Sequence, residues 1–292
     1  AICRRICCSP MPSFNAEEAL TYMEMFNISI VHGVPTMFIN YLEVLKKRDF
    51  DLHSFRTGVM AGAPCPVEVM KGASNKMGAN IVIAYGLTEA SPVITMTQLD
   101  DSLMDRVETV GKALPEQEVR IVDDDHKELP RGETGELAVR GYNVMKGYFK
   151  KPEATKEAID EDGWLYSGDL AVMDERGYVK IVGRKKDMYI SGGFNVYPRE
   201  IEEFLHSITA VENVSVLGVP DPKFGETGLA VIKRVEGKTI SEEEVLNYCK
   251  VNLANFKVPK YIWFVDEYPM TSSGKIQKFK LRDMALEKFN LK

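Results

Sequence analysis

The spacing of apolar residues changes along this chain, and that change limits the folds it can adopt. Over residues 1–106, helix-spaced segments alternate with short β-branched runs. Asn15 and Glu18 have the spacing of a helix N-terminal capping box, and residues 28–31 and 80–84 are typical of buried strands. This alternation predicts an α/β fold with a parallel, doubly wound sheet, which places ligands at the carboxyl ends of its strands.

After residue 106 the pattern becomes that of hairpins. Glycines and prolines separate short alternating runs, such as 118–122 and 136–140, which predicts a small distorted barrel or sheet. From residue 186 onward, the expected order is helix, strands, helix, strand and helix. That order is typical of a compact α+β unit.

Composition excludes several classes of protein. A formal charge of −6 argues against a general nucleic-acid binder. No apolar run approaches the roughly 18 residues that a membrane-spanning helix needs. The five cysteines lack paired zinc-site spacing, and their odd number favours a reducing compartment. We therefore expect a cytoplasmic protein, with the mitochondrial matrix as the alternative.

Familiar catalytic signatures are absent from the sequence. It contains neither G-x-G-x-x-G, nor G-x-S-x-G, nor H-E-x-x-H. The run at 271–275 is superficially similar to a phosphate loop, but Pro269 replaces the first glycine and Ile276 the metal-binding hydroxyl residue. Dinucleotide-dependent, hydrolase and zinc-enzyme functions therefore have no support.

One run does combine suitable chemistry. The A-Y-G-L-T-E run at 84–89 follows a predicted strand and supplies an aromatic ring, a hydroxyl and a carboxylate, which could stack a base, bind a phosphate and hold Mg²⁺. Y-S-G-D at 166–169, G-R-K-K-D at 183–187 and P-M-T-S-S-G-K-I at 269–276 follow in order. Together these runs resemble the adenylate-forming superfamily, and most closely its fatty (medium-chain type) acyl-CoA synthetases.

The resemblance implies an ATP-dependent ligase that joins a fatty acid to CoA through an acyl-adenylate. It implies ATP or AMP contacts at Gly62, Ala63, Tyr85, Gly86, Thr88, Asp169, Arg184 and Lys275. Lys275, Thr88 and Glu89 would be catalytic, and Glu89 would bind Mg²⁺. Further implied roles are a CoA path at Gly192 and Gly193 and a domain hinge at Lys186 and Asp187.

Each residue taken alone also has an ordinary structural interpretation. Tyr85 could be a core aromatic, Asp169 a cap and Arg184 a surface ion-pair partner. Gly192 and Gly193 could form an ordinary turn. Two other functions stay open. The enzyme could pass its acyl group to a carrier protein or to oxygen instead of CoA, or the chain could be a non-catalytic interaction fragment.

The resemblance also implies a division of the chain. We expect the truncated C-terminal part of a large α/β AMP-binding subdomain over 1–106, a β-rich barrel-like subdomain over 107–185 and an α+β lid domain over 186–292. The superfamily's N-terminal Ser/Thr/Gly-rich phosphate loop has no counterpart in this sequence. We therefore expect the chain alone to be inactive or nearly so, and we keep a homodimer open.

Overall fold

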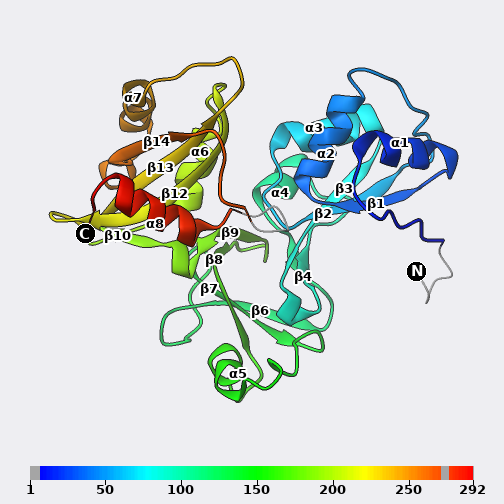
Figure 1. Ribbon diagram of the computed structural model, residues 1–292. Helices are drawn as coiled ribbons and strands as arrows, with labels where there is room; N and C mark the ends of the chain where they lie inside the picture. The colour runs from blue at the N-terminus through cyan, green and yellow to red at the C-terminus, as the bar shows by residue number, and fades with distance from the viewer. Residues whose placement is uncertain (1–6, 271–275, 292) are drawn as a thin grey trace. The chain divides into compact units, whose positions relative to one another are not determined.

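The computed structural model, drawn in Figure 1, describes residues 7–270 and 276–291. The candidate catalytic residue Lys275 lies outside these residues. The chain forms two compact units: unit 1 is Ala1–Ser167 with Val172–Ile181, and unit 2 is Gly168–Ala171 with Val182–Lys292. No helix in the described part of the chain is long and apolar enough to cross a bilayer.

Unit 1 contains a five-stranded sheet in the order β1-β2-β3-β4-β5. Its strands are β1 (Ile30–Gly33), β2 (Thr57–Ala61), β3 (Asn80–Gly86), β4 (Val93–Met96) and β5 (Lys112–Ala113). The first three run parallel, which confirms the α/β prediction, whereas β4 and β5 are antiparallel to their neighbours. The connection between β3 and β4 is too short for a parallel crossover, so the sheet is mixed rather than wholly parallel.

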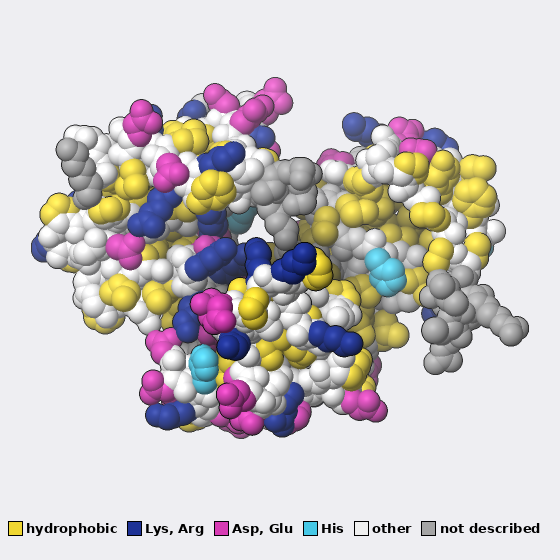
Figure 2. Space-filling model, turned by 60° about the horizontal axis from the view of Figure 1, so that its bottom comes forward, with side chains coloured by type: hydrophobic (Ala, Val, Ile, Leu, Met, Phe, Trp, Pro, Cys, Tyr) yellow, Lys and Arg dark blue, Asp and Glu magenta, His cyan; other side chains and the backbone are white. Residues whose placement is uncertain are grey.

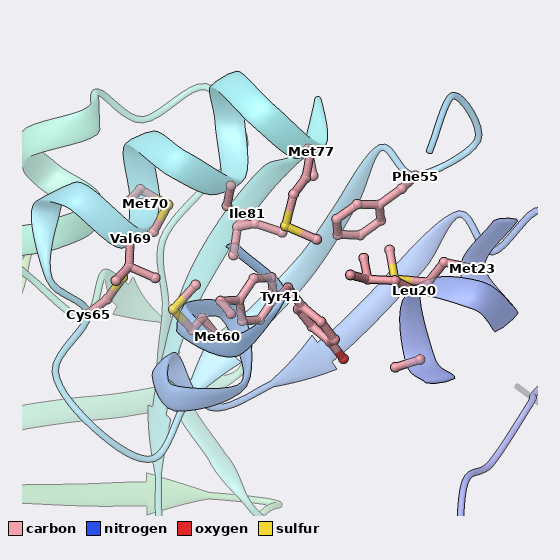
Figure 3. Close-up of a cluster of buried hydrophobic side chains, with 14 of the residues drawn as sticks. Leu20, Met23, Tyr41, Phe55, Met60, Cys65, Val69, Met70, Met77 and Ile81 are labelled. Carbon is pink, nitrogen blue, oxygen red and sulfur yellow. The ribbon is translucent and has the colours of Figure 1, made fainter. Parts of the chain in front are cut away.

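Three helices share one core with this sheet: α1 (Ala16–Met25), α2 (Pro35–Val44) and α3 (Val67–Met77). The predicted cap of α1 is present, since the Glu18 backbone N–H donates to Asn15 Oδ1 at 3.0 Å. Figure 3 shows Leu20 of α1, Tyr41 of α2 and Met60 of β2 converging between the helices and the strands. In the described part of unit 1, these helices pack against the sheet through this shared core.

A second sheet has the order β6-β7-β8-β9. Its strands are β6 (Gln117–Val122), β7 (Thr134–Gly141), β8 (Leu165–Met173) and β9 (Val179–Arg184). Strands β6 and β7 form the predicted antiparallel hairpin. The described strands leave β6 and β9 as open edges, so the predicted barrel does not close. Four strands are too few, because small closed barrels have about eight. Strands β8 and β9 carry the chain from unit 1 into unit 2.

Unit 2 is an α+β arrangement. Its sheet has the order β11-β10-β13-β12, with β14 parallel to β13. The elements are β10 (Tyr189–Ser191), β11 (Phe194–Val196), α6 (Pro198–Leu205), β12 (Val211–Asp221), β13 (Gly225–Arg234), α7 (Glu242–Asn252), β14 (Tyr261–Val265) and α8 (Lys278–Lys288). The predicted order of helices and strands is found from α6 onward, whereas strands β10 and β11, which precede α6, were not predicted. Helices α6 and α7 pack on the sheet through one apolar cluster, and α8 packs on it through another.

A pair of glycines makes room for a buried aromatic ring in unit 2. Gly218 of β12 and Gly228 of β13 face each other across the antiparallel ladder, and Tyr189, only 2% exposed, packs over both. A Cβ on Gly228 would lie 2.6 Å from the Tyr189 Oη. That hydroxyl has no hydrogen-bond partner among the described residues. Burial raises the pKa of Tyr189 far above its ordinary value.

Apolar side chains are also exposed on unit 1. Met25 is 63% exposed and Phe26 is 57% exposed at the end of α1, and Ile39 of α2 is 37% exposed. Figure 2 shows yellow apolar side chains gathered over the right-hand part of the view, where Figure 1 draws α1 and α2. Charged residues of both signs are scattered over the rest of the visible face. Surface of this kind is a common site of protein–protein contact.

Candidate active site

The ends of two neighbouring parallel strands bring the first predicted site residues together. Ala61 of β2 pairs with Ala84 of β3, so Gly62 and Ala63 follow one strand at the level where Tyr85 continues the next. Gly62 has a φ of +85°, a conformation that favours glycine. The carboxyl edge of the sheet thus presents a narrow backbone turn beside a half-buried aromatic ring.

A tight turn then positions Thr88 and Glu89. A Cβ on Gly86 would overlap the Pro92 carbonyl group, so only glycine fits where β3 meets β4. The 3-10 turn Thr88–Ala90 follows, and its last residue is fully buried. Thr88 is exposed and Glu89 is half-buried. The turn therefore has one anchored end and two polar side chains that solvent or a ligand can reach.

Glu89 is held by a loop that comes much later in the chain. The Tyr148 hydroxyl donates to Glu89 Oε1 at 2.9 Å, and the Met145 backbone N–H donates to the Glu89 carbonyl oxygen at 2.8 Å. Asn143 Nδ2 donates to the Ala90 carbonyl oxygen at 3.0 Å. The hydrogen bond to Glu89 raises the pKa of Tyr148 above its ordinary value. The sequence alone assigned no role to Tyr148.

Glu89 is the carboxylate that this turn offers to Mg²⁺. Among the described residues, no three His, Cys, Asp or Glu side chains gather as a metal cage. Mg²⁺ is commonly bound through one or two carboxylates, with substrate phosphates and water completing its coordination. A single reachable carboxylate fits that pattern. Glu89 could therefore contribute one ligand to a magnesium ion that a nucleotide brings with it.

Asp169 and Arg184 form a second group, which lies in unit 2. Asp169 is in β8 and is 7% exposed, and Arg184 ends the neighbouring strand β9. Arg184 Nε lies 3.4 Å from Asp169 Oδ1, and the arginine side chain is 53% exposed. Arg184 therefore has an ion-pair partner, as its structural interpretation predicted, and that partner is Asp169, which is also a predicted ATP or AMP contact. A buried carboxylate beside a cationic donor suits recognition of a vicinal diol.

The predicted hinge residues lie next to a cavity within unit 2. Lys186 and Asp187 belong to the 3-10 turn Lys185–Asp187. They help to line a cavity of about 590 Å³ together with Arg184. Lys278 Nζ, at the start of α8, lies 3.6 Å from Asp187 Oδ2 and 2.9 Å from Glu202 Oε1 of α6. Sequence reasoning missed Lys278, which connects the turn to two helices.

Gly192 and Gly193 form the turn between β10 and β11. Their φ values are +58° and +88°, so both need the conformational freedom of glycine. The Gly192 backbone N–H donates to the Phe224 carbonyl oxygen at 2.9 Å, which ties the turn to the β12–β13 hairpin. A Cβ on Gly193 would meet nothing within 4 Å. Backbone conformation alone therefore explains this glycine, and its part in a CoA path stays a prediction.

The described site residues thus fall into two sets. Unit 1 holds Gly62, Ala63, Tyr85, Gly86, Thr88 and Glu89. Unit 2 holds Asp169, Arg184, Lys186, Asp187, Gly192 and Gly193.

Comparison with known proteins identifies the family. The AMP-binding enzyme family model matches residues 2–149, and the AMP-binding enzyme C-terminal domain matches residues 200–275. The putative acyl-CoA synthetase YngI of Bacillus subtilis is 55% identical over 97% of this chain and 52% of its own length. The mitochondrial medium-chain acyl-CoA ligase ACSF2 of Bos taurus is 43% identical over 98% of this chain and 46% of its own length.

A solved structure gives the same result. ATP-bound MatB from Rhodopseudomonas palustris superposes with a TM-score of 0.86 and 39% identity, covering 94% of this chain and 54% of that one. This chain spans about half the length of the curated relatives it matches. The first family model alone spans half of the sequence and covers the site residues of unit 1, from Gly62 to Glu89. The chain belongs to the AMP-binding enzyme family.

Proposed function

We propose that this chain belongs to an ATP-dependent fatty acyl-CoA ligase. The observation that carries the proposal is the strand-end edge of unit 1, where Gly62 follows β2, Tyr85 lies in the paired strand β3 and Thr88 begins the 3-10 turn after β3. An aromatic ring, a backbone turn and a hydroxyl suit an adenine base and its phosphate. Relatives named acyl-CoA synthetase and medium-chain acyl-CoA ligase support a fatty acid as the substrate.

The reaction has two steps. A carboxylate oxygen attacks the α-phosphorus of ATP, the bond between that phosphorus and the bridging oxygen breaks, and pyrophosphate leaves. The sulfur of CoA then attacks the acyl carbon of the adenylate. AMP leaves with the bonding electrons, and the thiol proton passes to solvent or a base. The products are acyl-CoA, AMP and pyrophosphate.

The chain's own residues would bind and orient the nucleotide. Tyr85 would stack on adenine, Thr88 would donate to the α-phosphate, and Asp169 would accept from the ribose hydroxyls with Arg184 beside it. Glu89 would hold Mg²⁺, which neutralises phosphate charge when it is bound. The side chain of Lys275 would stabilise the charge that develops on the phosphate and carboxylate oxygens. Gly192 and Gly193 would let the pantetheine arm of CoA pass close to the backbone.

Binding of a stable reaction mimic tests the proposal. Isothermal titration of the chain with alkyl esters of AMP, from short to long alkyl groups, should give the tightest binding at medium length. Asp169→Asn should weaken binding about 10- to 100-fold, because hydrogen bonds to a charged group contribute about 1.5–3 kcal/mol. Asp283→Asn, an exposed position on α8, is the matched control and should bind like the unaltered chain. Absence of binding by the unaltered chain would contradict the proposal.

A product assay separates CoA from other acceptors. The same protein, supplied with ATP, Mg²⁺, a medium-chain fatty acid and CoA, is sampled for acyl-CoA by mass spectrometry. Because we expect the chain alone to be inactive or nearly so, any turnover should be slow, and acyl-CoA is the product that we expect from it. Release of pyrophosphate that does not respond to CoA would favour a different acceptor.

A further inference from the structure

We propose that Tyr148 is a positioning residue for the divalent cation that accompanies ATP. Its hydroxyl holds one carboxylate oxygen of Glu89 and leaves the other oxygen, Oε2, to the cation. This inference rests on the proposed function, because it gives Glu89 a cation to bind. It adds a residue that acts through Glu89 and has no contact with the metal itself.

The loop that carries Tyr148 is fixed to the Glu89 turn at more than one point. Asn143, which is 5% exposed, donates to the Ala90 carbonyl oxygen, and the Met145 N–H donates to the Glu89 carbonyl oxygen. These bonds hold the backbone of the turn, and the Tyr148 bond holds the side chain. Backbone and carboxylate of Glu89 are therefore oriented by the same loop.

Tyr148 is itself held in place. Its backbone N–H donates to Thr155 Oγ1 at 2.9 Å, and Thr155 belongs to α5 (Pro152–Ala158). Gly147 precedes it with a φ of +141°, and a Cβ there would lie 2.7 Å from Thr155 Cγ2. A larger residue at Gly147 would displace the loop. The loop and α5 therefore form one support for the phenol ring.

The chemistry of a phenol suits this task. Tyr148 is the only side chain of the described residues recorded in a hydrogen bond with the Glu89 carboxylate. A neutral donor fixes the direction of a carboxylate without cancelling its negative charge, whereas Lys or Arg would compete with the cation for it. Partners that orient metal ligands commonly contribute about 10–100-fold to metal affinity.

The decisive experiment compares Tyr148→Phe with Tyr142→Phe. Tyr142 lies in the same loop, is 71% exposed and makes no recorded hydrogen bond among the described residues, so it is a matched control. Isothermal titration measures ATP binding to the chain at a series of MgCl₂ concentrations. We expect Tyr148→Phe to raise the Mg²⁺ concentration for half-maximal binding about tenfold. AMP binding in EDTA should not change in Tyr148→Phe. If the substitution only disrupted the local structure, AMP binding would weaken as well.

A second measurement tests the hydrogen bond without nucleotide. With ¹³Cζ-labelled tyrosine, the NMR chemical shift of Tyr148 at neutral pH, assigned from its loss in Tyr148→Phe, should move in Glu89→Gln, because the variant lacks the charged acceptor of this hydrogen bond. An unchanged chemical shift would overturn the inference. Mg²⁺-dependent ATP binding that is the same in Tyr148→Phe and the unaltered chain would also overturn it, while leaving the proposed function intact. No ATP binding by the unaltered chain would reject the proposed function, and the role of Tyr148 with it.

Discussion

At the scale of single residues, the packing of Tyr189 over Gly218 and Gly228 leaves no space for a larger side chain at either glycine. We expect Gly228→Ala to lower the free energy of unfolding of unit 2 by about 1–3 kcal/mol, as overpacking commonly does. The new methyl group would collide with the Tyr189 hydroxyl at 2.6 Å and approach the Pro259 Cα at 3.2 Å. Urea unfolding followed by circular dichroism measures the change.

Tyr189→Phe provides the control for this prediction. Alone it should be nearly neutral or slightly stabilising, because the hydroxyl it removes is buried and has no partner among the described residues. In the Tyr189→Phe background, Gly228→Ala should lower the free energy of unfolding by less, because the Tyr189 hydroxyl oxygen that the new methyl group would meet first is absent. An equal cost in both backgrounds would show that the hydroxyl is not the obstacle.

The site residues found from sequence share one property: each belongs to a short local run. Tyr85 lies in β3, and Thr88 and Glu89 lie in the 3-10 turn that follows it, so all three come from one short stretch of sequence. Tyr148 is separated from Glu89 by 59 positions, and Lys278 from Glu202 by 76. One sequence carries no local signal for such pairings, because long-range packing alone creates them.

At the scale of elements, Asp221 holds the hairpin between β12 and β13. Its Oδ1 accepts from the backbone N–H groups of Lys223 and Phe224 at 2.8 and 2.9 Å, and its Oδ2 accepts from Lys260 Nζ at 2.6 Å. The Lys260 ammonium and these backbone donors lower the pKa of Asp221 from an ordinary 3.8 to about 2. The folded state therefore binds the proton at this carboxylate less tightly than the unfolded chain does.

That difference predicts a pH dependence of stability. A depressed folded-state pKa stabilises the protein fully above the unfolded value, and this stabilisation is lost as the pH falls from about 4 to about 2. Asp221→Asn should lower the melting temperature of unit 2 at pH 7 and weaken its decline over that acid range. Differential scanning calorimetry at several pH values measures both effects. Asp283→Asn, exposed on α8, should keep the normal acid decline.

Elements with strong periodicity were predictable, and those shaped by pairing were not. Pro35 and the apolar spacing after it predict helix α2, and Ser241 caps helix α7 with a complete capping box. Strand β2 and the short antiparallel strand β4 gave no distinct pattern, because both depend on β3 for their hydrogen bonds. The open β6–β9 sheet was predicted as hairpins, but whether it closes depends on how many strands meet.

At the scale of the whole molecule, the two units have separate apolar cores. Leu20 is fully buried in the core of unit 1, and Val216 is fully buried in that of unit 2. We expect two calorimetric transitions instead of one, since a chain with separate cores need not unfold in a single step. The predicted division of the chain at residues 106 and 185 stays a prediction beside this observed pair of units.

Leu20→Ala assigns the transitions. Removing a fully buried leucine side chain costs about 2–5 kcal/mol, so the transition of unit 1 should move to a lower temperature. The transition of unit 2 should stay where it is, and Gly228→Ala should have the opposite selectivity. A single transition that both variants move together would contradict separate unfolding of the units.

The attachment of residues 143–148 to the Glu89 turn has a consequence for how this protein can vary. Asn143, Met145 and Tyr148 meet successive points of that turn, so the number of residues between them matters more than the identity of the residues between. Substitution at Val144 or Lys146 should therefore be tolerated, whereas insertion or deletion of one residue would shift Tyr148 away from Glu89. In evolution, residues 143–148 should keep their number, while the residues at positions 144 and 146 vary.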